Sequence, residues 1–309
     1  MSYEDNLMFK IAWYYYFDDL TQQQISDKLG ITRMNVIKLL AKAKSQGIVH
    51  FKIRTDGEHR LSIERELVRK YGLEDVFVIP TAGVNQNESI ALAAAQYVEA
   101  RLTPDCYINV GYGDTITRVI RNLLNTLDSP VSLVSLTGGV SYYTSSIISG
   151  AHKSDFNGIT PSIYLIPAPV IASTPELARD FMSDESVKSI MSMNDRASMS
   201  IIGIGAATDD ATIFKDNKIS PNERVLLQMS GAVGDLLSQF IDKNGQVVQS
   251  DLHDRLVATK LDVLKKYHNV IGVAAGESKV NAMHAALLGG YLNTLITDED
   301  TATRLLAIN

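Results

Sequence analysis

The chain has 309 residues, of which 45% are hydrophobic and 21% charged, and its formal net charge is -6. This length and composition suggest a globular protein of two domains, and the net acidity excludes a protein that coats nucleic acid along its whole surface. The single cysteine, Cys106, excludes an internal disulfide framework. The sequence has no signal-peptide pattern and no apolar run long enough for a membrane span, so we expect a cytoplasmic protein with no membrane partner.

The first 17 residues predict a helix, because apolar side chains recur there at helical spacing. Leu7, Ile11, Ala12, Tyr15 and Tyr16 fall on one face of this helix. We expect the helix to support the segment that follows, with its aromatic residues packed in a core rather than stacked on bases.

Residues 19–49 have the pattern of a helix-turn-helix. Thr21 is placed to cap a first short helix, Gly30 permits a tight turn, and Thr32 is placed to cap a second helix that runs to about Gln46. Apolar residues occur where two crossed helices must touch, namely Leu20, Ile25, Leu29, Ile31, Val36 and Leu40. In such a pair the second helix enters the major groove of DNA.

Positive charge is concentrated in and after this segment. No acidic residue occurs from residue 28 to residue 54, and the basic ones there are Lys28, Arg33, Lys38, Lys42, Lys44, Lys52 and Arg54. Phosphate backbones attract positive charge concentrated in this way, so we expect double-stranded DNA as a partner. We predict that Arg33, Asn35 and Lys38 face base edges, since arginine pairs well with guanine and asparagine with adenine. The other candidate DNA contacts, mainly to the backbone, are Thr21, Gln22, Gln23, Thr32, Lys42 and Lys44.

A short strand is expected after the second helix. Beyond Gly47, the apolar residues Ile48, Phe51 and Ile53 alternate with polar or basic neighbours. This alternation is typical of a half-exposed strand, such as the wing of a winged helix.

The boundary between the two domains is expected directly after this strand. A polar linker follows, and then a helix over residues 61–73 that Gly72 ends. We therefore expect a DNA-binding domain over residues 1–55. The remainder, residues 56–309, is expected to form the second domain.

From Val76 to the end of the chain, short apolar segments alternate with helical ones. Strands that are apolar throughout and separated by helices indicate a largely parallel sheet covered on both faces. Among the helices we expect one over residues 175–193 and one led by residues 231–235. The predicted fold class is α/β, with an N-terminal winged helix-turn-helix and a C-terminal, largely parallel α/β sheet domain.

Two glycine-rich turns follow neighbouring strands of the predicted sheet. The first consists of Gly111, Tyr112, Gly113, Asp114 and Thr115, and it opens a helix. Glycines let backbone amides point at one spot, and a helix start adds positive charge, so the turn suits a phosphate. A plain strand-to-helix turn would have the same sequence. A second turn at Thr137, Gly138 and Gly139 makes a shared phosphate pocket the better interpretation, although neither turn matches a Walker loop or a dinucleotide fingerprint.

Two charged residues are candidates for the same pocket. Lys279 opens a helix after an apolar strand and could reach a phosphate or sugar oxygen, although a solvated helix lysine is an equal alternative. Asp235 could accept hydrogen bonds from sugar hydroxyls, or it could simply cap the helix expected there. The histidines are scattered without metal-ligand spacing and no nucleophile elbow occurs, so we expect no metal, no cofactor and no catalytic residue.

The segment YYYFDDLTQQQISDKLGITRMNVIKLLAKAKSQGIV resembles the helix-turn-helix of SorC-type (SorC/DeoR) sugar-binding transcriptional regulators. The C-terminal part contains further motifs that are similar to this family, namely NVGYGDT, LTGG, GIGA, VGD and GGYLNTLITDEDTA. The resemblance covers essentially the whole chain, and the motifs are specific only in combination.

The resemblance implies that residues 56–309 form a sugar-binding effector and oligomerisation domain, with the fold of phosphosugar isomerases and CoA-transferases. It also implies a homo-oligomer, commonly a tetramer, whose DNA affinity changes when a phosphorylated sugar or polyol binds. By the family's pattern, the effector contacts map onto Gly111–Thr115, Thr137–Gly139, Asp235 and Lys279. Asp114 departs from what the site needs, because its acid would repel phosphate unless it points away.

We therefore expect a DNA-binding transcriptional regulator, and specifically a repressor of a carbohydrate or polyol catabolic operon. The alternative is a phosphosugar isomerase, which the sheet domain alone permits but which has no use for the N-terminal module. A purely architectural DNA-binding protein would not need the large α/β domain.

Overall fold

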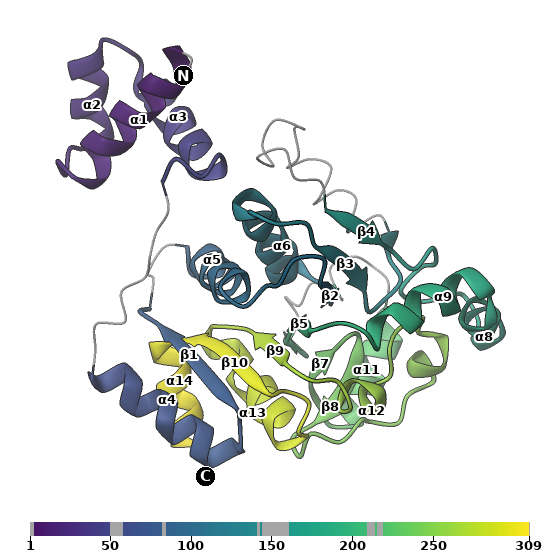
Figure 1. Ribbon diagram of the computed structural model, residues 1–309. Helices are drawn as coiled ribbons and strands as arrows, with labels where there is room; N and C mark the ends of the chain where they lie inside the picture. Colours follow the sequence, from purple (N-terminus) through teal and green to yellow (C-terminus); the bar gives the residue numbers. More distant parts are fainter. Residues whose placement is uncertain are drawn as a thin grey trace.

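The computed structural model describes residues 3–49, 58–81, 85–140, 143, 161–208, 214 and 219–308. Its first three helices are α1 (Tyr3–Tyr16), α2 (Gln22–Leu29) and α3 (Arg33–Ser45), and Figure 1 shows them as a group set apart from the rest. They have a small core of their own, built from Ile11, Ile25, Val36 and Leu40. The helix expected at the start of the chain is therefore confirmed.

The local signals of the helix-turn-helix are also confirmed. The Thr21 hydroxyl accepts a hydrogen bond from the Gln24 amide, and the Gln24 side chain accepts one from the Thr21 amide at 2.8 Å, which is a capping box. Gly30 ends α2 with φ +66°, and Thr32 caps α3 through the Asn35 amide at 3.2 Å. The wing strand and the expected boundary fall mainly on residues 50–57, which lie outside the described residues.

The second part of the chain is built on a seven-stranded parallel sheet (Figure 1). Its order is β1-β10-β9-β5-β2-β3-β4. The strands are β1 (Asp75–Ile79), β2 (Tyr107–Val110), β3 (Ser132–Ser135), β4 (Ser162–Tyr164), β5 (Met199–Gly203), β9 (Val270–Val273) and β10 (Thr294–Asp298). The prediction of a largely parallel α/β domain is confirmed.

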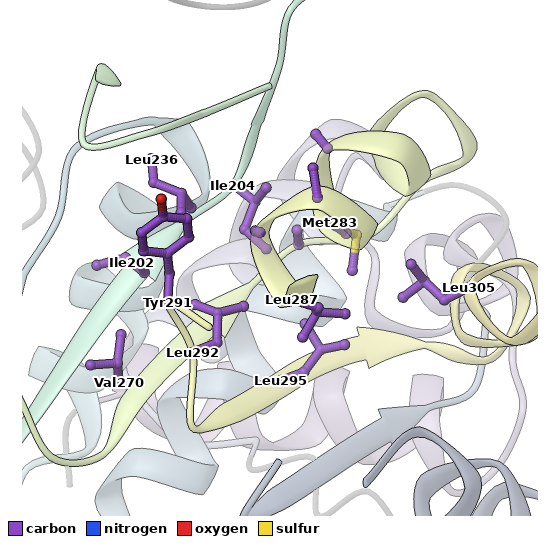
Figure 2. Packing of buried hydrophobic residues seen from close by; sticks show 14 of the residues in the cluster. Ile202, Ile204, Leu236, Val270, Met283, Leu287, Tyr291, Leu292, Leu295 and Leu305 are labelled. Carbon is purple, nitrogen blue, oxygen red and sulfur yellow. The ribbon is translucent and has the colours of Figure 1, made fainter. Parts of the chain in front are cut away.

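Helices cover both faces of the sheet, which is why its central strands are mostly apolar and buried on both sides. On one face lie α5 (Gln86–Glu99) and α6 (Asp114–Thr126), and on the other lie α4 (Glu58–Tyr71), α13 (Val280–Leu288) and α14 (Glu299–Ala307). Figure 2 shows part of the core on the face covered by α4, α13 and α14, with side chains of α13, β10 and α14 packed together. Among the described residues, no helix is long and apolar enough to cross a membrane.

The expectation of a helix led by residues 231–235 is wrong. The helix α11 (Pro221–Met229) ends before this segment, and the segment itself forms β7 (Ala232–Leu236). With β6 (Gly205–Ala206) and β8 (Gln239–Asp242), β7 makes a small antiparallel sheet. The turn between β7 and β8 has two residues, both with positive φ, as tight hairpins require.

The helix expected over residues 175–193 is two helices, α8 (Pro175–Ser183) and α9 (Glu185–Asn194). Asp184 between them has extended backbone, with φ -64° and ψ 137°. Its carboxylate accepts a hydrogen bond from the Ser186 amide at 2.8 Å, so it starts a new helix where the first one ends. The short helices η1 (Asp251–Arg255) and α12 (Leu261–Leu264) also lie outside the main sheet.

Candidate functional site

A cavity of about 590 Å³ lies beyond the carboxyl ends of β2, β5 and β9. This is the edge at which ligands bind in open parallel sheets. Five separate segments line the cavity, and their residues are Gln86, Asn87, Tyr112, Gly113, Asp114, Thr115, Gly203, Ile204, Gly205, Ala206, Thr208, Asp235, Leu237, Ser238, Ala275, Gly276, Ser278 and Lys279. The structure thus brings together Tyr112–Thr115, Asp235 and Lys279 from the predicted effector contacts.

Three helical segments begin at this cavity without a side-chain cap. They are α5 after Asn85, α6 after Gly113, and η2 (Glu277–Lys279) after Gly276, and none of these three cap residues makes a side-chain hydrogen bond to the first turn of its helix. By contrast, side chains cap α2, α3, α8, α9, α11 and α14. Uncapped amides and the positive ends of helix dipoles make a helix start attractive to an anion. The cavity therefore favours a negatively charged ligand.

Asp235 and Lys279 place opposite charges in the same cavity. Burial raises the pKa of Asp235 to about 6, although a hydrogen bond from the Ser238 amide at 3.2 Å and the charge of Lys279 both act to lower it. Gly205 lies directly against this carboxylate, because a Cβ at Gly205 would fall 1.9 Å from the Asp235 Oδ1. A carboxyl held in this way suits hydrogen bonds to hydroxyl groups of a ligand.

Sequence reasoning missed the turn between β7 and β8, which also reaches the cavity. Leu237 and Ser238 have φ values of +50° and +65°, which non-glycine residues adopt at a cost. The Ser238 side chain is buried, and its Oγ has no hydrogen-bond partner among the described residues. A buried hydroxyl without a partner at a cavity is a candidate ligand contact. The turn could not be predicted from the sequence, because the residues Leu-Leu-Ser-Gln lack the asparagine or glycine that is typical of such a hairpin.

A buried network connects two of the uncapped helix starts. The Gln86 amide group donates to the Asp298 carboxylate, which also accepts the Thr301 amide at 2.8 Å. The Thr301 hydroxyl in turn accepts the Gly276 amide at 2.8 Å. Gln86 and Asp298 are 212 residues apart, so no local pattern in the sequence could have indicated this contact.

The structure corrects the expectation that the turn at Thr137–Gly139 shares this cavity. The Gly138 amide donates to the Val257 carbonyl at 2.9 Å and the Gly139 amide to the Ala168 carbonyl at 2.7 Å, so neither is open to an anion. A Cβ at Gly138 would lie 2.4 Å from the Pro169 carbonyl oxygen. These glycines serve close backbone packing instead.

Gly111 also lies apart from the residues that line the cavity. Its amide donates to the Ile201 carbonyl at 2.8 Å, as a continuation of the pairing between β2 and β5. Within the predicted phosphate turn, only Tyr112–Thr115 reach the cavity.

The predicted DNA-reading side chains lie on the exposed side of α3. Arg33, Asn35 and Lys38 are exposed, whereas Val36 and Leu40 are buried against α1 and α2. Arg33 lines a hollow of about 760 Å³ together with Thr21, Gln22 and Gln23 at the amino end of α2. The structure therefore brings both predicted classes of DNA contact onto one surface.

Other features of this surface were not predicted. The Lys42 ammonium group pairs with Glu4 of α1 at 2.8 Å, so a phosphate contact by Lys42 would have to replace this exposed ion pair. Met34 is 72% exposed beside Arg33, where an apolar side chain can meet the methyl group of thymine.

Among the described residues, no group of three or more His, Cys, Asp or Glu could hold a metal ion.

Comparisons with known proteins identify the family of this chain. The family model described as "Putative sugar-binding domain" matches residues 56–307. The transcriptional regulator LsrR of Klebsiella pneumoniae is 34% identical over 310 residues, with 99% of this chain and 94% of the relative covered. LsrR of Escherichia coli strain K12 is 37% identical over 308 residues, with 98% and 95% covered.

Solved structures of regulators are similar as well. The full-length sorbitol operon regulator SorC of Klebsiella pneumoniae has a TM-score of 0.72 at 28% identity, with 99% of this chain and 100% of that chain covered. A DeoR family transcriptional regulator from Listeria monocytogenes has a TM-score of 0.71 at 18% identity over 79% of this chain, and this likeness concerns the fold alone.

These relatives are named as regulators of transcription and not as enzymes, which confirms the expectation of a regulator over an isomerase. The family match covers the domain that holds the cavity, and the SorC likeness extends over the N-terminal helices. The chain belongs to the SorC-type family of sugar-binding transcriptional regulators.

Proposed function

We propose that this regulator represses a carbohydrate or polyol catabolic operon and that a phosphorylated sugar or polyol controls its affinity for DNA. The observation that carries this proposal is the cavity, in which uncapped helix starts, Lys279, Asp235 and Ser238 converge. Its volume of about 590 Å³ suits a small metabolite.

The proposed ligand pose follows from the charges of the cavity. The phosphate group lies at the amides that open α6 and η2, within reach of Lys279, because these are the positive groups of the site. The hydroxyl groups lie toward Asp235 and Ser238, which supply a carboxyl and a buried hydroxyl without a protein partner.

The proposed DNA contacts are divided between bases and backbone. Arg33, Asn35 and Lys38 project from the first half of α3 and read base edges in the major groove. The capped amino ends of α2 and α3, together with Lys42, contact phosphates, and the residues of those ends are Thr21, Gln22, Gln23 and Thr32.

The regulator acts as a homo-oligomer in this proposal, and the tetramer is the assembly that the family resemblance implies. Two recognition helices must lie about 34–36 Å apart to read successive half-sites on one face of DNA. The effector prefers a quaternary arrangement in which this spacing is lost, and its differential affinity for the two arrangements sets the size of the response.

A thermal-shift screen of the full chain tests the ligand class directly. Sugars and polyols are compared with their phosphorylated forms, because a ligand at 100 times its dissociation constant adds about 2.7 kcal/mol of stability. We expect stabilisation by a phosphorylated compound and little or none by its unphosphorylated counterpart. Equal stabilisation by both members of every pair, or by neither, would contradict the proposal.

A further inference from the structure

An acidic residue opens the helix that forms the proposed anion site. Asp114 is the first residue of α6 and lines the cavity, where a carboxylate without a basic partner would repel a phosphate group. In the structure its Oδ2 accepts a hydrogen bond from the Arg118 Nε at 2.8 Å, one turn further along the same helix. The pair holds the carboxylate at the flank of α6 instead of in front of its open amides.

A second acid next to the cavity uses the same guanidinium group. Glu88 follows the lining residues Gln86 and Asn87 at the start of α5, and its Oε2 lies 2.9 Å from the Arg118 Nη1. Arg118 therefore bridges the first turns of two helices whose uncapped ends face the cavity. Burial alone would raise the pKa of Glu88, but hydrogen bonds from Asn122 and Arg118 and the charge of Arg121 hold it below its usual value.

The charges of this cluster balance. Asp114 and Glu88 are acidic, and Arg118 and Arg121 are basic. Arg121 donates to both carboxylate oxygens of Glu88, at 2.9 and 2.8 Å, and among the described residues it forms no contact with Asp114. Loss of either arginine thus removes one positive charge and one partner of Glu88, but only loss of Arg118 releases Asp114.

We propose that Arg118 is a positioning residue for the anion site, and this rests on the proposed function. By holding Asp114, it keeps the carboxylate from turning toward the amides of α6, where it would compete with the phosphate group of the effector. It also offsets the negative charge that Asp114 places beside that phosphate group. The acid in the phosphate turn is therefore tolerated because its partner lies four residues later in the same helix.

The test is a set of full-length variants titrated with inorganic phosphate and with ribose 5-phosphate by calorimetry. Arg118→Gln should weaken binding of both probes roughly tenfold, since an unpaired carboxylate near an anion repels it in a partly exposed site. Adding Asp114→Asn to Arg118→Gln should restore affinity to within about threefold of the wild type, because the repelling charge is gone. Raising the salt concentration should shrink the defect of the single variant.

Arg121→Gln is the matched control, because it removes the same charge from the same cluster but leaves Asp114 held. An equal loss of affinity in Arg121→Gln, or a loss in Arg118→Gln that Asp114→Asn does not repair, would show a merely structural ion pair and overturn the inference. Melting temperatures of all variants separate a binding defect from unfolding. Failure of the wild type to bind any phosphorylated compound of the thermal-shift screen would refute the proposed function itself, and with it this inference.

Discussion

The N-terminal helical module, which we propose reads DNA, and the candidate effector cavity differ in how far apart their parts lie along the chain. The module consists of three successive helices within residues 3–45, and its small core holds Ile25 and Val36 together. The cavity draws on segments from Gln86 to Lys279, joined by buried contacts such as the one between Gln86 and Asp298. Module function therefore depends on exposed side chains of a locally determined fold, whereas cavity function depends on backbone that distant residues hold in place.

Ile25→Ala should have the largest effect and should separate the two regions. Ile25 is completely buried in the module core, so its truncation should cost about 2–5 kcal/mol. We expect loss of operator binding in a mobility-shift assay and loss of hydrogen-exchange protection in α2. The full-length variant should still be stabilised by a phosphorylated ligand. If ligand binding were lost together with DNA binding, the two regions would not be independent in the way described.

Gly234→Ala should damage the cavity side instead. A Cβ there would lie 2.3 Å from the Ala282 Cβ and 2.6 Å from the Gly205 carbonyl oxygen, so β7 would have to move away from α13 at a cost of about 1–3 kcal/mol. Calorimetric unfolding should show a lower melting temperature, with hydrogen-exchange protection of α2 and α3 unchanged. Gly203→Ala is the control, because its added Cβ meets its nearest neighbour at an ordinary 3.5 Å. Equal destabilisation by both variants would argue against this packing.

Arg33→Ala should show that the module carries specificity on its surface. Loss of a base contact by an exposed arginine should cost about 1–3 kcal/mol on operator DNA and much less on random DNA, with stability unchanged. Lys44→Ala, which removes a candidate phosphate contact, should weaken binding to both DNAs alike. Competition titrations distinguish the two patterns. Uniform weakening by Arg33→Ala would reassign this residue to the backbone.

Asp235→Asn should change how the stability of the protein depends on pH. Because burial raises the pKa of Asp235 to about 6, the folded state holds a proton that the unfolded state releases at lower pH. The free energy of unfolding contributed by this group is therefore full below the unfolded pKa and is lost as pH rises toward 6, an effect of about 3 kcal/mol. Denaturant titrations from pH 4 to pH 7 should show this decline in the wild type and a flatter profile in the variant. The same decline in both would place the titration elsewhere.

Sequence reasoning succeeded where the deciding contacts are local. The caps at Thr21 and Thr32 act on amides three residues away, and Gly30 acts on its own φ angle, so composition and spacing were sufficient. The strands of the parallel sheet could also be predicted from local sequence, because strands buried on both faces form short runs of mainly apolar residues.

It failed where a distant segment decides the outcome. The glycines at 138 and 139 have the composition of a phosphate turn, yet carbonyl groups of Ala168 and Val257 occupy their amides. The segment at residues 231–235 became a strand because β8 pairs with it, across a turn of Leu237 and Ser238 that has no glycine. Tertiary contacts override local propensity in both cases.

The central claim is that occupancy of the cavity changes the affinity of the module for DNA, and one titration tests it most directly. Operator affinity is measured by fluorescence anisotropy across a series of phosphorylated sugars and polyols, for the wild type and for Lys279→Ala. We predict that at least one compound shifts the wild-type affinity and that the variant needs roughly tenfold more of it, while ligand-free DNA binding is unchanged. An operator affinity that no phosphorylated compound alters, in either protein, would contradict the account.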